Sequence, residues 1–201
     1  MLQYYQPTPL EQWIEALWSR AGIVTPDQLT IPEVSERLDV WVHYMDATSK
    51  ALEWMGIRSV LIDLRLTAER QWEDYLHELC HILRHAGNQT VMPRSFLEHQ
   101  EADAKRFVLY AAMPYSMVRE VGLPSARGEA IQLLSRRFGV TCELAALRLD
   151  QFQRRAFEAV LWEEIGRWNK EKASKGAGLE ERRHQEREEG FDENEKDASG
   201  H

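Results

Sequence analysis

Cysteine is scarce in this sequence. Cys80 and Cys142 are the only two cysteines among 201 residues, and they stand 62 positions apart without a C-x-x-C spacing. This content excludes a disulfide framework, which needs several paired cysteines, and it excludes a zinc knuckle built from cysteine pairs. Scarce cysteine fits a reducing compartment, so we expect a cytoplasmic protein.

Long apolar segments and excess basic charge are also missing. No stretch reaches the roughly 18 to 20 apolar residues of a membrane-spanning helix, and the N-terminus lacks the basic and apolar segments of a signal peptide. The 25 lysines and arginines are outnumbered by 33 aspartates and glutamates, which gives a net charge of −8. This balance argues against coating nucleic acid or an anionic membrane as the main role. We therefore expect a soluble protein with no membrane partner and no direct nucleic-acid partner.

Large apolar side chains are nearly absent from the end of the chain. Residues 170–201 contain ten acidic and seven basic residues, with Leu179 and Phe191 as the only large apolar ones. Such a segment cannot bury enough surface to offset the entropy lost on ordering, so we predict a charged tail that is disordered or weakly helical. We predict that the preceding chain forms a core over residues 1–115 and a helical part over residues 116–169.

The apolar pattern alternates between helical and strand periodicity, which predicts an α+β fold. Thr8 and Glu11 form a capping box with Pro9 between them, so we expect a helix to begin there. Residues 39–46 alternate in polarity, as in a strand. Further strands are predicted over 51–55 and 59–66, and helices over 32–38, 68–85, 96–113, 127–138 and 141–168. We expect a small antiparallel sheet with an active-site helix, followed by a helical C-terminal part.

The predicted helix over 68–85 carries the pattern H-E-x-x-H at residues 77–81. Four residues make about one helical turn, so His77 and His81 project from one face about 6 Å apart at Cβ, as two ligands of one Zn²⁺ require. Glu78 lies beside them, where its carboxylate can reach a metal-bound water as a general base. Ordinary core or surface histidines and a surface glutamate would give the same letters.

A zinc ion held by two histidines needs a third protein ligand if its fourth position is to hold water. The predicted helix over 96–113 offers Glu98, His99, Glu101 and Asp103. Glu101 lies on a stripe whose other members are apolar, and a carboxylate on a buried stripe is costly unless a cation neutralises it. We therefore predict Glu101 as the third ligand, with Glu98 and Asp103 as alternatives.

Simpler roles are expected for the polar residues around this site. Glu98 stands three residues after Ser95 and is predicted to complete a capping box. Asp103 shares with Arg106 and Tyr110 a polar helix face that we expect to be solvated. His85 continues the i, i+4 series from His81 but lies a turn beyond the metal, where packing or support of a ligand is the expected role.

These residues resemble the ImmA/IrrE family of zinc metallopeptidases. The similarity extends over roughly residues 30–150 and includes H-E-L-C-H and F-V-L-Y-A-A-M-P, which matches the family's F-A-A-E-L-L-M-P. In that register the family's E-x-E-A-N falls on residues 101–105, so the resemblance also indicates Glu101 as a metal ligand. The family usually has Asn or Asp four residues after this glutamate, where it can orient a zinc histidine. Here that residue is Lys105, whose ammonium group cannot accept a hydrogen bond.

The resemblance implies a zincin-like fold and a cytoplasmic zinc-dependent endopeptidase. Family members whose role is understood cut a helix-turn-helix repressor and so release a prophage, a mobile element or a stress regulon. The resemblance thus implies that His77, His81 and Glu101 bind zinc, that Glu78 is catalytic, and that the protein partner is such a repressor.

Two other functions stay open from the sequence. Lys105 is compatible with a metal-binding interaction module that has no protease activity. Residues 133–149 have the helix, glycine turn and helix of a DNA-reading motif. Because Glu143 and two alanines occupy early positions of the second helix, we consider DNA binding the weaker alternative.

Overall fold

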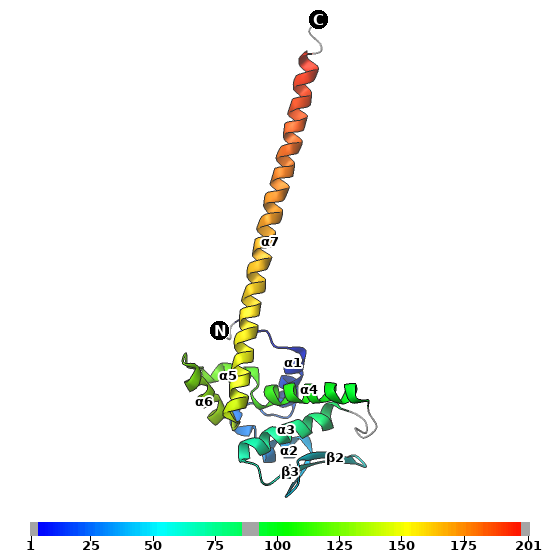
Figure 1. Ribbon diagram of the computed structural model, residues 1–201, viewed down its shortest axis with the longest axis vertical. Helices are drawn as coiled ribbons and strands as arrows, with labels where there is room; N and C mark the ends of the chain where they lie inside the picture. Colours follow the sequence, from blue (N-terminus) through cyan, green and yellow to red (C-terminus); the bar gives the residue numbers. More distant parts are fainter. Residues whose placement is uncertain (1–3, 86–92, 198–201) are drawn as a thin grey trace.

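The computed structural model describes residues 4–85 and 93–197 of the chain. These residues form a body of short helices and one small sheet, from which the last helix projects (Figure 1). The α+β class predicted from the sequence is confirmed.

The first helix, α1 (Pro9–Arg20), begins at the predicted capping box. The Glu11 N–H donates to Thr8 Oγ1 at 3.1 Å, and the Thr8 N–H donates to Glu11 Oε2 at 2.8 Å. The apolar stripe of α1 is buried against the rest of the body, with Ile14 and Trp18 at most 1% exposed. A short 3₁₀ helix, η2 (Pro26–Gln28), and α2 (Ile31–Leu38) lead from there to the sheet.

The three strands form one mixed sheet in the order β1-β3-β2. β2 (Lys50–Trp54) and β3 (Ile57–Asp63) are antiparallel, as predicted, but β1 (Trp41–Met45) runs parallel to β3. The expectation of an all-antiparallel sheet is therefore wrong. β3 is the most buried of the three strands, so it takes the centre and separates β1 from β2. The chain reverses once before β2 and once after it, which leaves β1 and β3 pointing the same way.

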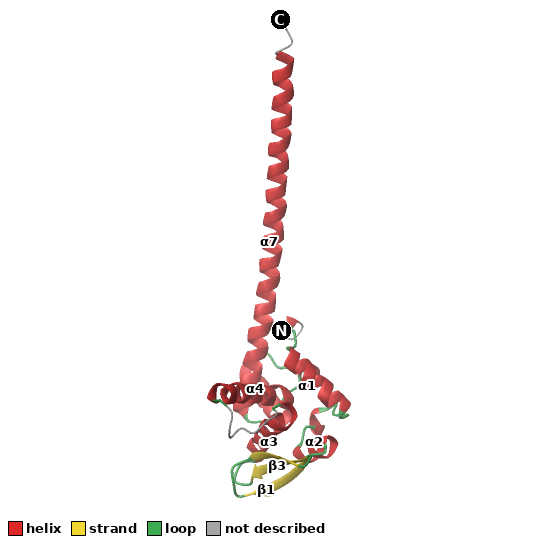
Figure 2. Cartoon of the chain, turned by 90° about the vertical axis from the view of Figure 1, so that its right-hand side faces the viewer, coloured by secondary structure: helices red, strands yellow, loops and turns green. Residues whose placement is uncertain are grey.

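Helix α3 (Ala68–Arg84) packs against β2 and β3 on one side and against α4 (Arg94–Ala112) on another (Figure 2). Thr67 caps α3, because its Oγ1 accepts a hydrogen bond from the Arg70 N–H at 3.4 Å. The apolar side of α3 is fully buried at Tyr75, Leu76, Leu79 and Cys80. The helix ends one residue before His85, close to the predicted end, and the predicted stop at residues 87–88 lies outside the described residues.

The predicted capping box at the start of α4 is not formed. Pro93 occupies the N-cap position, no side chain caps the helix, and α4 begins before Ser95. The Glu98 carboxylate instead accepts a hydrogen bond from Arg94 Nε at 3.0 Å, one turn earlier. A charged partner at i−4 has replaced the backbone N–H that a capping glutamate would bind.

The C-terminal part contains α5 (Tyr115–Val121), α6 (Arg127–Phe138) and α7 (Cys142–Asp197). The bounds of α6 agree with the prediction, but α5, which follows Pro114 directly, was not predicted. Gly139 has φ 61° between α6 and α7, a left-handed conformation that suits glycine. α7 continues through residue 169 and far beyond the body (Figure 1). The division into 1–115, 116–169 and 170–201 stays a prediction.

The start of α7 is tied to α1 by a buried ion pair. Arg148 is 0% exposed, and its Nη1 donates to Glu11 Oε1 at 2.8 Å and to Gln151 Oε1 at 2.7 Å. The Tyr5 hydroxyl donates to the same Glu11 oxygen at 2.6 Å. We call these four residues the Glu11–Arg148 cluster.

Among the helices of the described part of the chain, none is both long and apolar enough to cross a membrane.

Candidate metal centre

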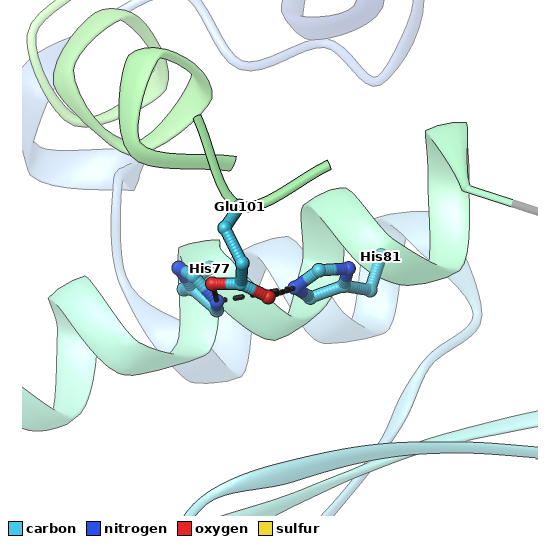
Figure 3. A group of neighbouring side chains, drawn as sticks. All are labelled: His77, His81 and Glu101. Atoms are coloured by element: carbon cyan, nitrogen blue, oxygen red, sulfur yellow. Dashed lines mark hydrogen bonds and ion pairs between the residues drawn. The ribbon is translucent and has the colours of Figure 1, made fainter. Parts of the chain in front are cut away.

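Two helices bring three potential metal ligands together. His77 and His81 lie one turn apart on α3, and Glu101 reaches them from the neighbouring helix α4 (Figure 3). One donor atom of each lies within 4.8 Å of the other two. The two histidine Nε2 atoms are 3.1 Å apart, and the Glu101 oxygens lie 3.4 Å from His77 Nε2 and 3.5 Å from His81 Nε2.

These separations fit one tetrahedral ion. Zinc bonds of 2.0–2.1 Å in a tetrahedron place neighbouring ligand atoms about 3.3 Å from one another. The two Nε2 atoms are 3.1 Å apart, and the nearest Glu101 oxygen lies at 3.4 Å from His77 (Oε2) and 3.5 Å from His81 (Oε1), so each separation is close to this value. Three side chains fill three corners, and Glu101 remains 48% exposed on the open side. The donor set of two imidazoles and one carboxylate is one that zinc uses in catalytic sites.

Glu78 lies next to this group and at the edge of the sheet. Its Oε2 accepts a hydrogen bond from the Ala51 N–H of β2 at 2.7 Å. Burial raises the pKa of Glu78 to about 7, and the nearby acids Asp74 and Glu101 add to the increase. A carboxylate with a pKa near neutrality can both accept and return a proton at neutral pH.

His81 is the more buried of the two histidines, with a side chain that is 9% exposed. Burial lowers the pKa of His81 to about 4, and the adjacent His77 and His85 lower it further. The imidazole is therefore neutral near pH 7, which is the state that binds a metal ion.

The buried-stripe argument for Glu101 needs a correction. Glu101 does meet both histidines, but it is about half exposed, and its neighbour Gln100 is the residue buried at 4%. The buried face of α4 thus begins at Gln100 and continues through Ala104 and Phe107. Glu101 lies at the border of that face, where the carboxylate can turn toward α3 and still contact solvent.

The two alternative ligands lie elsewhere. Glu98 is exposed and paired with Arg94, outside the group formed by the histidines and Glu101. The prediction that Asp103 lies on a solvated face is wrong, because its side chain is 15% exposed and is covered by the end of α3. Tyr110, from the same predicted polar face, is also buried. Asp103 contacts Arg84 of α3 and Tyr110 lies against Arg148 of α7, whereas Arg106 of the same face is exposed.

Asp103 and His85 form a second polar group behind the first. Asp103 Oδ2 lies 2.9 Å from Arg84 Nε and 3.3 Å from His85 Nε2. His85 Nδ1 in turn lies 2.9 Å from His81 Nδ1. The i, i+4 spacing of His77, His81 and His85 was the sequence signal for this contact. The partner Asp103 could not be predicted, because the contact depends on how α3 and α4 cross.

Residues 35–150, more than half of the chain, match the Peptidase M78 family, described as the IrrE N-terminal-like domain. The chain belongs to this family. The family consists of metallopeptidases, whose substrates are proteins. The match confirms the resemblance seen in the sequence.

Two relatives from Bacillus subtilis (strain 168) support this membership. The phage-like element PBSX protein XkdA is 38% identical over 146 residues, which are 73% of this chain and 74% of that protein. An uncharacterized protein, YqaB, is 32% identical over 151 residues, or 75% of this chain and 88% of that one. A solved structure of a Mycobacterium tuberculosis transcriptional regulator is 19% identical, with a TM-score of 0.49, over 68% of this chain and 44% of that one.

Proposed function

We propose that this M78 family member is a cytoplasmic zinc-dependent endopeptidase that makes a site-specific cut in a protein. The observation that carries the proposal is the meeting of His77, His81 and Glu101, whose nitrogen and oxygen atoms approach one another to 3.1–3.5 Å, with Glu78 beside them. Its proposed substrate is a helix-turn-helix repressor of a prophage, a mobile element or a stress regulon. The substrate class rests on the family resemblance and on one relative whose name includes a phage-like element.

In this proposal His77, His81 and Glu101 hold the zinc ion. Bound zinc would supply a Lewis acid that activates a water molecule and polarises the scissile carbonyl. Glu78 would accept the proton of the attacking water and deliver it to the leaving amine nitrogen, which its raised pKa favours.

The sheet edge beside Glu78 suits an extended substrate. β2 is an edge strand, and the Ala51 N–H that meets Glu78 points away from β3, so the backbone of β2 borders the candidate metal centre. An extended peptide can add to such an edge through main-chain hydrogen bonds. The substrate residues on either side of the scissile bond would then lie alongside β2, with the scissile carbonyl near His77, His81 and Glu101.

Two alternatives are weighed by specific residues. The inactive metal-binding module stays an alternative because of Lys105. This exposed cation lies where family members usually have Asn or Asp. DNA binding is disfavoured by the surroundings of residues 133–149. Ala145 and Arg148 are fully buried, so these positions of α7 face protein, and the acidic Glu143 pairs with Arg70 of α3.

The test is co-expression of the full chain with candidate repressors, followed by mass spectrometry. The wild type should convert its substrate to two discrete fragments. Glu78→Gln should keep zinc and substrate binding but lower cleavage by roughly 10²-fold or more, because it removes a proton acceptor and no ligand. Glu98→Gln, an exposed change on α4, is the matched control and should cleave normally. Intact substrate with zinc-loaded wild type would favour the inactive module, while cleavage by Glu78→Gln at the wild-type rate would exclude Glu78 as the base.

A further inference from the structure

A line of polar contacts leads from the candidate metal centre toward the core. It starts at His81 Nδ1, which lies 2.9 Å from His85 Nδ1, and continues from His85 Nε2 to Asp103 Oδ2 at 3.3 Å. Asp103 is held in turn by Arg84 Nε at 2.9 Å. The Arg84 guanidinium lies 5.1 Å from the ring centre of Trp13 on α1. Three helices therefore meet at this line.

The protons along the line can be arranged in one way once His81 Nε2 binds a metal. A ligating Nε2 has no proton, so the His81 proton lies on Nδ1 and is donated to His85 Nδ1. His85 then accepts at Nδ1 and carries its own proton on Nε2. That proton is donated to Asp103, an acceptor that can terminate the line.

Asp103 is built to act as this terminal acceptor. Arg84 and Arg106 lie at its two oxygens, with Arg106 Nη2 at 3.6 Å from Oδ1. The His85 side chain is 9% exposed, so neighbouring protein also limits how far its ring can turn.

We propose that His85 and Asp103 are positioning residues that fix the tautomer and ring orientation of His81, and that Asp103 replaces the acceptor lost at Lys105. This inference rests on the proposed zinc site. Metal-bound histidines usually donate their second N–H to a carboxylate or carbonyl, and loss of such a partner typically lowers metal affinity by about 10 to 100-fold. Here the carboxylate acts through an intervening imidazole.

A competing explanation is a second metal site, because donor atoms of Cys80, His85 and Asp103 also lie within 4.8 Å of one another. The Arg84 guanidinium bonded to Asp103 disfavours a cation at that place. His85 Nδ1 is also occupied by His81. The positioning role uses the Arg84–Asp103 and His81–His85 contacts, whereas a second ion would have to break both.

The experiment measures zinc affinity of the full chain by competition with a chromophoric chelator, together with the visible spectrum of the Co²⁺-loaded protein. His85→Phe should weaken zinc binding by about 10 to 100-fold and change the Co²⁺ bands, because His81 Nδ1 loses its acceptor. Asp103→Asn keeps an acceptor without the charge and should give a smaller loss. Asp103→Glu keeps the carboxylate and should retain most of the wild-type affinity for zinc. Glu98→Gln, an exposed change on the same helix, is the control and should bind zinc like the wild type.

The outcomes separate this inference from the proposed function. Wild-type protein that binds no zinc overturns both. Wild-type protein that binds one equivalent, with His85→Phe and Asp103→Asn equal to it in affinity and Co²⁺ spectrum, overturns the positioning role alone. Two equivalents of zinc, reduced to one by Cys80→Ala, would assign His85 and Asp103 to a second site. The melting temperature of each metal-free variant separates a general loss of structure from a local effect, and equal loss of affinity in Asp103→Glu and Asp103→Asn would also count against the proposal.

Discussion

Glu11 on α1 and Glu78 on α3 are both shielded from water, but their surroundings differ. Glu11 accepts hydrogen bonds from Tyr5 and Thr8 and forms a buried ion pair with Arg148. Burial raises the pKa of Glu11, but Arg148 and these hydrogen bonds outweigh burial and lower it. Glu78 accepts a hydrogen bond from Ala51, has acids nearby, and has a pKa raised to about 7.

The difference fits the proposed roles, in which Glu11 serves stability and Glu78 serves the chemistry. In the Glu11–Arg148 cluster the protein supplies a cation for the buried carboxylate. At the candidate metal centre, Glu101 lies beside two histidines, of which His81 is kept neutral by burial, and Glu78 directly follows His77 in the chain. A cluster of carboxylates and neutral imidazoles is costly in a folded protein unless a cation, such as a bound metal ion, neutralises it. In the first cluster the charge of Glu11 is matched by Arg148. In the second, the proposed zinc ion would supply the matching charge.

The largest effect, on zinc binding, is expected when one of the proposed ligands is removed from the candidate metal centre. His81→Ala and Glu101→Gln should each weaken zinc binding by orders of magnitude, because three protein ligands are the minimum for a catalytic site. Glu98→Ala should leave zinc binding unchanged, since Glu98 is exposed and paired with Arg94. Chelator competition measures all three variants. Loss of zinc in Glu98→Ala with retention in Glu101→Gln would reverse our assignment of α4.

The next effect concerns stability and separates the two carboxylates directly. Glu11→Gln leaves Arg148 buried without a counter-charge, so the free energy of unfolding should fall by about 3–5 kcal/mol. Glu78→Gln should leave the stability of the metal-free protein unchanged or higher, because the replaced carboxylate is held without a cation. Urea unfolding of both variants gives the comparison. Asp150→Asn is the control, since its exposed pair with Arg127 should contribute at most about 1 kcal/mol. Equal destabilisation by Glu11→Gln and Glu78→Gln would remove the distinction.

A smaller effect is expected in acid. Because the pKa of Glu11 is lower in the folded protein than its ordinary value of 4.5, its contribution is fully present above pH 4.5. The contribution is lost as the pH falls through the folded pKa and Glu11 becomes protonated. The stability difference between metal-free wild type and Glu11→Gln should therefore be constant from pH 7 to pH 5 and should narrow below pH 4.5. A gap that widens in acid would show that another group dominates.

The sequence predicted the helical spacing of the site better than the packing around it. H-E-x-x-H placed His77, Glu78 and His81 on one helix because that spacing depends on local geometry alone. The proximity of Glu101 to both histidines agrees with the prediction although the supporting argument was wrong, since a residue at the border of a buried face has nearly the same helical phase as one inside it. Asp103 was misplaced because its burial depends on the crossing of α3 and α4.

Other features could not be predicted from local sequence pattern. Nothing in the local sequence predicts the burial of Arg148, which lies between two leucines, because its charge is matched by Glu11, 137 positions away in the chain. The parallel pairing of β1 with β3 was missed because alternation predicts a strand but not its neighbour. α5 was missed because it is a seven-residue helix between Pro114 and Gly122, too short to show a clear period.

The smallest effect is expected at the far end of α7, where the same helix changes from core to surface. Up to Ala156 it contributes buried residues, among them Arg148 and Phe152, whereas Phe157 and Trp168 are 69% and 56% exposed. Truncation after Lys170 should therefore shift the melting temperature by less than about 2 °C, which for a chain of this size corresponds to at most about 1 kcal/mol. Truncation after Leu147 removes the arginine that neutralises Glu11 and should abolish cooperative unfolding. Differential scanning calorimetry of the two truncated proteins makes the comparison. A drop of several degrees on removal of the tail alone would mean that the charged segment contacts the body, and α7 would then belong to the folded unit over its whole length.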